Sequence, residues 1–275
     1  SMLCATTGHL PLDLGFWPSS QDALVPSTPD DLPTVARALL ERGWDTRLVS
    51  ANPVFSNDFE TAQGFGTVIL RDWESADVIA ERALEQAETL VSPWYLHLHF
   101  FDPHQPFCPP ASYLTDLDAL PDVGIDVCDQ LQLGVGQFPG QDAAWQQALL
   151  DRVDVAYGGE LRFFDDTLAG LWADLDARGL LDDTLVLFFT DHGEQILERG
   201  VIDHGFQLYA EENRAVAGFW AKSLTAGAWA GPTLHTDLAA TVLDLHAIPA
   251  PATMTGIPVG QAPDDRVTRL LAYSV

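Results

Sequence analysis

The stretch "LVLFFTDHGEQILERGVIDHGF", residues 185–206, begins as a buried strand and ends in side chains that can bind metals and anions. Its first six residues are apolar or β-branched, which is typical of a strand inside a sheet. Asp191, His192 and Gly193 follow without a spacer, and a second His-Gly pair begins at His204. Polar side chains placed directly behind such a strand indicate a functional site at its end.

Strands alternate with helices along the rest of the chain. Helical apolar spacing with capping signals predicts helices at about 30–42, 75–91, 143–178 and 235–248. Strands are predicted at 46–50, 94–101 and 185–190, and a Pro- and Gly-rich surface excursion at about 109–141. This order predicts an α/β fold, a three-layer α/β/α sandwich around a mostly parallel sheet, formed by residues 1–275 as a single domain.

The composition limits the partners. The formal charge is −27, with 40 acidic against 13 basic residues, so the surface repels nucleic acid and anionic lipid, and we expect neither as a partner. No apolar run is long enough to span a membrane, and the start lacks a signal-peptide pattern, which slightly favours a cytoplasmic location. Cys4, Cys108 and Cys128 show neither close pairing nor metal-site spacing, so we expect free thiols rather than a disulfide scaffold.

Two more segments should bring histidines to the end of the 185–190 strand, because ligands gather at the carboxyl ends of strands in open α/β sheets. Asp191 and His192 suit a divalent cation, although Asp191 capping a following helix and His192 merely packing is an equally open interpretation. His104 is held between Pro103 and Pro106 after the 94–101 strand, where an imidazole can donate to a developing negative charge. His204 lies in a similar short turn.

At this point the chain resembles the sulfatase branch of the alkaline phosphatase superfamily. The resemblance covers almost all of residues 4–260 and is most specific across residues 157–194. The matching segments are "TTGHLPLDLGFW", "DDLPTVARALLERGWDTRLVSANP", "GFGTV", "HFFDPHQPFCPP", "YGGELRFFDDTLAGLWADLDARGLLDDTLVLFFTDHGE", "DHGFQLYAEENR" and "TDLAATVLDLHAIPAP". It implies an alkaline phosphatase-like fold.

The resemblance also implies roles for single residues. Asp191 and His192 would be metal ligands, with Ca²⁺ favoured over Mn²⁺ and Zn²⁺. His104 would contact the ester and assist the leaving group, and His204 would contact the sulfate or phosphate oxygens. Asn52 lies near the position of a substrate-contacting basic residue in many relatives, so its amide is a departure from the family pattern.

Part of the family pattern is missing from the printed sequence. Family members begin with a strand carrying two acidic metal ligands, followed by a nucleophile loop whose cysteine becomes formylglycine. "CATTGH", residues 4–9, lacks the Pro and Arg of that loop, so Cys4 is a poor nucleophile and formylglycine has no source here. The small C-terminal subdomain is also only begun. We therefore expect one sulfatase-like domain that is incomplete at both ends.

The sequence thus predicts a metal-dependent hydrolase of small-molecule sulfate or phosphate monoesters, with little or no activity in this chain for want of the nucleophile. The alternative is a catalytically silent binding or scaffold protein of the same fold. A further alternative is a phosphatase, phosphodiesterase or phosphoryl transferase of the superfamily. The choice between sulfate, phosphate and phosphonate depends on the nucleophile segment, and the oligomeric state is left open.

Overall fold

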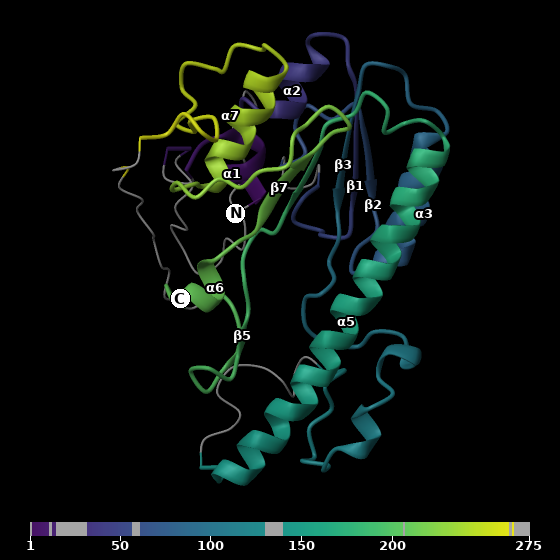
Figure 1. Ribbon diagram of the computed structural model, residues 1–275, viewed down its shortest axis with the longest axis vertical. Coiled ribbons are helices and arrows are strands. Elements are labelled where there is room, and N and C mark those ends of the chain that lie inside the picture. The colour runs from purple at the N-terminus through teal and green to yellow at the C-terminus, as the bar shows by residue number, and fades with distance from the viewer. Residues whose placement is uncertain are drawn as a thin grey trace.

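The computed structural model describes residues 2–10, 13–14, 32–56, 61–129, 140–205, 207–263 and 266. These residues form helices and strands in alternation (Figure 1). The helices are α1 (Met2–Thr7), α2 (Val35–Leu40), α3 (Ala76–Ala87), α5 (Ala143–Ala177), α6 (Ala210–Asn213) and α7 (His235–Leu245), with 3₁₀ turns at Ala111–Tyr113 and Leu117–Ala119. The strands are β1 (Asp45–Ser50), β2 (Thr67–Leu70), β3 (Trp94–His99), β4 (Val186–Phe189), β5 (Gln195–Ile196), β6 (Ile202–Asp203) and β7 (Ala217–Trp220).

The sheet confirms the predicted α/β class and refines its topology. Strands β2, β1 and β3 form a parallel sheet in that order, with Ser50 opposite His99 at its carboxyl end. β4 instead pairs antiparallel with β7, and β5 pairs antiparallel with β6. Within the described residues β3 and β4 do not pair with each other, and both line a cavity of about 920 Å³. Parallel pairing is therefore confined to the three strands around β1.

Helices cover both faces of the parallel sheet (Figure 1). On one face Ile79 of α3 packs with Val49 of β1, and α5 adds Leu171 against α3. On the other face α2 and α7 form a shared apolar cluster that includes Leu39 and Leu243. Because strand side chains alternate between these two helix layers, residues on both faces of β1 are buried. The predicted layers are confirmed.

Local signals fix the helix ends. The Thr34 hydroxyl accepts from the Arg37 N–H at 3.0 Å at the start of α2, and Asp142 accepts from the Trp145 N–H at 2.8 Å at the start of α5. Gly179, with φ of 72°, follows the end of α5.

The part of the chain that the structure describes contains no helix both long enough and apolar enough to cross a membrane.

The expectation of three free thiols is wrong for two of them. Cys108 and Cys128 form a disulfide, while Cys4 is a buried free thiol. The excursion after β3 folds back on itself, since the Phe107 N–H donates to the Val127 carbonyl at 3.1 Å and both side chains enter one apolar cluster. Packing at this distance in sequence, rather than cysteine spacing, brings the sulfurs together.

Candidate active site

Asp191 and His192 lie where β4 ends. The Thr190 N–H donates to the carbonyl of Val216, the residue directly before β7, and the chain then turns away at Gly193. A Cβ on Gly193 would collide with the Glu211 carbonyl oxygen at 2.1 Å, which accounts for glycine at this position. The described residues between 193 and 209 contain no helix. The interpretation of Asp191 as a helix cap is therefore wrong.

The three predicted histidines meet at this point. The ring of His192 stacks on that of His204 with centroids 3.9 Å apart, and His104 stands edge-on to His204 at 5.0 Å. The three residues come from the ends of β4 and β6 and from the loop after β3. The structure thus brings together the residues that the sequence placed at one site.

The carboxylate of Asp191 is held ionised. Burial is the largest single influence and opposes its charge, but electrostatic interactions with His192 and His99, together with smaller contributions that include a backbone hydrogen bond, outweigh burial, so the pKa of Asp191 is lowered below its usual value. Its Oδ2 lies 3.6 Å from His192 Nε2, beyond hydrogen-bond range. Two ligands at right angles on a calcium ion, each at about 2.3–2.6 Å, are about 3.3–3.7 Å apart. The pair has the charge and the spacing to hold a divalent cation.

His99, the last residue of β3, is a further member of the site; from the sequence it could be a ligand, but packing against a helix was favoured. It lines the same cavity as Asp191, and its buried Nδ1 has no hydrogen-bond partner among the described atoms. Burial lowers the pKa of His99 and the nearby Asp191 carboxylate raises it, with a net decrease. A neutral imidazole with an unused buried nitrogen is suited to a metal. Its position at the end of a strand, as for Asp191, was the available signal.

His97 on the same strand face has a different role. Its Nδ1 lies 3.0 Å from the Tyr95 hydroxyl, and aromatic rings including Phe55 and Phe189 surround it. Complete burial lowers the pKa of His97 to about 3. His97 is therefore a neutral packing residue.

His104 is held in one orientation. Its Nδ1 lies 2.6 Å from the Gln105 carbonyl oxygen, and because that oxygen only accepts, Nδ1 carries the hydrogen. Burial is the main cause that lowers the pKa of His104. The other ring nitrogen, Nε2, is left for a substrate. An imidazole anchored in this way can exchange a proton with a leaving oxygen.

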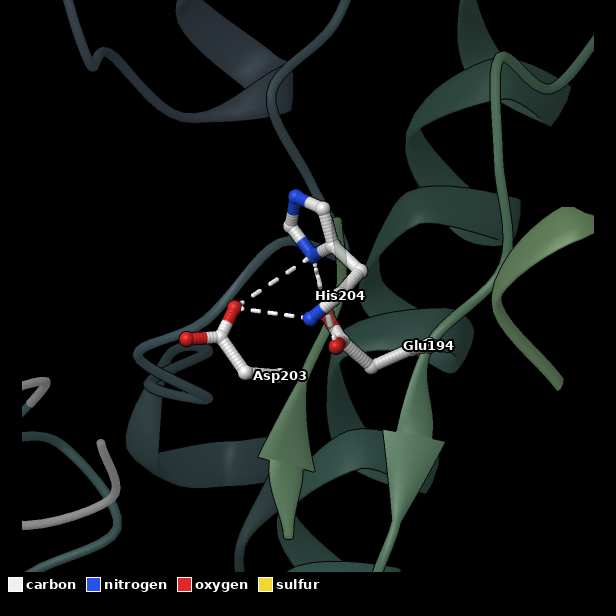
Figure 2. A group of neighbouring side chains, drawn as sticks. All are labelled: Glu194, Asp203 and His204. Carbon is white, nitrogen blue, oxygen red and sulfur yellow. Dashed lines mark hydrogen bonds and ion pairs between the residues drawn. The ribbon is translucent and has the colours of Figure 1, made fainter. Parts of the chain in front are cut away.

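His204 is oriented by two carboxylates that the sequence interpretation did not select. Its Nδ1 lies 3.2 Å from Glu194 Oε2 and 3.7 Å from Asp203 Oδ1, and its backbone N–H donates to Asp203 (Figure 2). Burial opposes the charge of the imidazolium, but the bond and charge of Glu194 outweigh it, so the pKa of His204 is raised. Figure 2 shows Nε2 pointing away from both carboxylates, which leaves a protonated N–H for an anion.

Glu194, Asp203 and His204 have ligand atoms within 4.8 Å of one another, close enough to hold a metal ion. Their hydrogen bonds already join Glu194 and Asp203 to His204. We therefore assign the two carboxylates to the orientation of His204.

Asn52 follows β1 and lines the same cavity. Its Oδ1 accepts from the Val54 N–H at 2.9 Å, which closes a local turn. The side-chain oxygen thus accepts from the backbone, and the side-chain NH₂ group is left to face a ligand.

A comparison with protein families matches residues 1–248 to the family model described as Sulfatase. The chain belongs to the sulfatase family. This sulfatase-family fold agrees with the expected alkaline phosphatase-like architecture, and the match covers every residue of the cluster around His204.

Among curated proteins, the chain is 29% identical to the choline-sulfatase of Rhizobium meliloti (strain 1021) over 177 residues, which is 57% of this chain and 32% of that protein. It is 26% identical over 148 residues to the multifunctional alkaline phosphatase superfamily protein PehA of Trinickia caryophylli, covering 46% of this chain and 29% of that protein. The matches therefore span about a third of each curated relative.

Solved structures share the fold. The phosphonate monoester hydrolase SpPMH of Silicibacter pomeroyi superposes with a TM-score of 0.72 at 18% identity, covering 97% of this chain and 68% of that chain. BT4656, solved with its substrate D-glucosamine-2-N,6-O-disulfate, gives 0.71 at 18% identity, covering 96% and 70%. At this identity the likeness establishes the architecture alone.

Proposed function

We propose that the chain carries the metal- and proton-handling part of a hydrolase of small-molecule sulfate or phosphate monoesters. The observation that carries the proposal is the cluster of an ionised Asp191 and three imidazoles, His192, His204 and His104, at one cavity. Membership of the sulfatase family supports it. No nucleic acid or membrane partner is proposed, because the net charge of −27 opposes both.

Asp191 and His192 would hold a divalent cation, with His99 as a third contact. The 3.6 Å separation of the first two ligand atoms and the unused buried nitrogen of His99 support this assignment. Membership of the sulfatase family leads us to favour Ca²⁺. Mn²⁺ and Zn²⁺ are the alternatives, because imidazole ligands suit Zn²⁺ and a carboxylate suits all three ions. When bound, the cation would polarise an ester oxygen and lower the energy of the charged transition state.

The chain's own histidines would manage charge and protons. His204, charged through its contact with Glu194, would donate from Nε2 to a non-bridging oxygen of the ester group. His104, whose Nδ1–H is fixed by the Gln105 carbonyl, would first take up a proton at Nε2. It would pass that proton to the bridging oxygen as the bond from this oxygen to sulfur or phosphorus breaks, and would return to the neutral Nδ1–H form. Asn52 is proposed as a weaker substrate contact through its amide.

We propose that the nucleophile does not come from the described residues. Cys4, the free thiol among them, is buried, and burial is the main cause that raises the pKa of its thiol. A protonated buried thiol is a poor nucleophile. We therefore propose very low turnover by the chain as printed, with a catalytically silent binding protein as the alternative.

The relatives do not agree on the ester. One is named a choline-sulfatase and another a phosphonate monoester hydrolase. For this chain we propose a sulfate monoester first, with phosphate or phosphonate esters of the same superfamily chemistry as the alternative.

The test compares binding with turnover. In buffer with Ca²⁺, we expect calorimetric binding of phenyl sulfate that His204→Ala weakens, with very slow release of phenol. No binding of phenyl sulfate, phenyl phosphate or phenylphosphonate would overturn the proposal. Rapid turnover that disappears in His104→Ala would support the reaction but overturn the expectation of very low turnover by the printed chain.

A further inference from the structure

Trp73 has a costly backbone conformation and an exposed side chain. Its φ is +61°, in the left-handed region that bulky residues rarely adopt, and the N–H of Trp73 is fixed by the Ala51 carbonyl at 2.9 Å. Its indole is 62% exposed, so burial in the core does not compensate for the strain. A strained residue that the core does not need points to a function for its side chain.

The indole stands at the outer end of a row of rings that leads to the candidate site. Trp73 meets Phe101 edge-on with centroids 4.5 Å apart, and Phe101 lies 4.3 Å from the ring of His104. His104 in turn contacts His204. Trp73, Phe101 and His104 all line the cavity that contains Asp191. The row therefore starts at the proposed leaving-group histidine and ends in solvent.

We propose that Trp73 and Phe101 form a platform for an aryl leaving group. The proposal rests on the proposed function, since His104 marks where the bridging oxygen of the ester lies. A group attached to that oxygen passes next to Phe101 and then the indole of Trp73. Aromatic pairs prefer centroid separations of about 4.5–7 Å, so a phenyl ring can stack in the space beside these residues. The platform selects esters of flat apolar alcohols over those of small alkyl alcohols.

The test uses 4-fluorophenol, the neutral leaving group, as a ¹⁹F NMR probe of the chain as printed. We expect saturable binding that Trp73→Ala weakens about tenfold and Trp73→Phe weakens less, because one stacking partner is lost or reduced. Trp229→Ala is the matched control, since Trp229 is also an exposed tryptophan, at 46%, but does not line the cavity. No saturable binding, or equal binding by the Trp73→Ala and Trp229→Ala variants, would overturn the platform.

A second measurement guards against misfolding. Trp73→Gly removes the Cβ strain at φ +61°, so we expect an unchanged or higher Tm, by about 2 °C, together with weaker fluorophenol binding. A lower Tm would mean that the indole supports the fold and would contradict the inference.

The ester-binding result separates this proposal from the proposed function. Phenyl sulfate should bind more tightly than 4-fluorophenol if the histidine cluster also binds the anion. Trp73-dependent binding of fluorophenol without any gain from the sulfate would keep the platform and overturn the hydrolase site.

Discussion

Two carboxyl sites near the histidine cluster have pKa values shifted in opposite directions. Asp191, at the end of β4, has a side chain 33% exposed beside two imidazoles, and its pKa is lowered. Glu160 of α5 is 4% exposed and shares a hydrogen bond with Asp102, two residues before His104. Burial, and then the charge of Asp102, raises the pKa of Glu160 to about 8, and burial is also the main cause that raises the pKa of Asp102.

The difference lies in the available counter-charge. Both sites lose water, which favours the neutral acid, but Asp191 has imidazoles close by whose electrostatic interactions lower its pKa. The acid pair of Asp102 and Glu160 holds a proton more readily than ordinary carboxyl groups, so we expect it to link α5 to the loop before His104 rather than to bind a metal. A count of acidic residues in the sequence cannot separate these two roles.

The largest expected effect is that of replacing His104, in the loop after Asp102. In a form of the protein that hydrolyses phenyl sulfate, His104→Ala should lower kcat/KM for this ester by about 10²–10⁴. The loss should be smaller for 4-nitrophenyl sulfate, because nitrophenolate leaves without a proton. Steady-state kinetics with the two esters measures both numbers. An equal loss for the two would mean that His104 only positions the substrate.

The next effect concerns the segment closed by the Cys108–Cys128 disulfide. The backbone N–H of Cys108 donates a hydrogen bond to the Glu160 carboxylate. Replacing Cys108 and Cys128 by serine removes the disulfide across 20 residues, and should lower the free energy of unfolding by about 3 kcal/mol. Urea denaturation measures this change, with Cys4→Ser as the control for loss of a thiol. A double variant as stable as the unmutated chain would show that the loop is held by its apolar packing alone.

A smaller effect tests the state of Glu160 directly. Its pKa is about 8 in the folded chain, above the ordinary value of 4.5 for a glutamate, so the folded state binds more protons between these limits. Stability should therefore fall as pH rises through this window. Glu160→Gln should remove this decline and be the more stable form at high pH. Melting curves across the window would contradict the account if both forms decline equally.

The sequence predicted the architecture well where local signals act. The helix beginning at Ala143 and the strand ending before Asp191 were both read from periodicity and caps. The antiparallel pairing of β4 with β7 was not predictable in this way, because strand direction is set by the path of the chain between them.

The site was predicted in part for a similar reason. Asp191, His192, His104 and His204 stand in short motifs, and the structure brings them together, although their roles are still predictions. His99 was assigned to packing and Glu194 was not selected, because each acts through a neighbour distant in sequence: His99 lies near Asp191, and Glu194 holds His204. The Cys108–Cys128 bond was missed for want of the same information.

The most direct test of the central claim is a calorimetric Ca²⁺ titration of three forms of the chain. The account predicts one site per chain that Asp191→Asn weakens about tenfold or more, while Glu160→Gln leaves the affinity unchanged. Equal Ca²⁺ affinity in the unmutated chain and in Asp191→Asn would contradict the assignment of Asp191 as the metal-binding carboxylate.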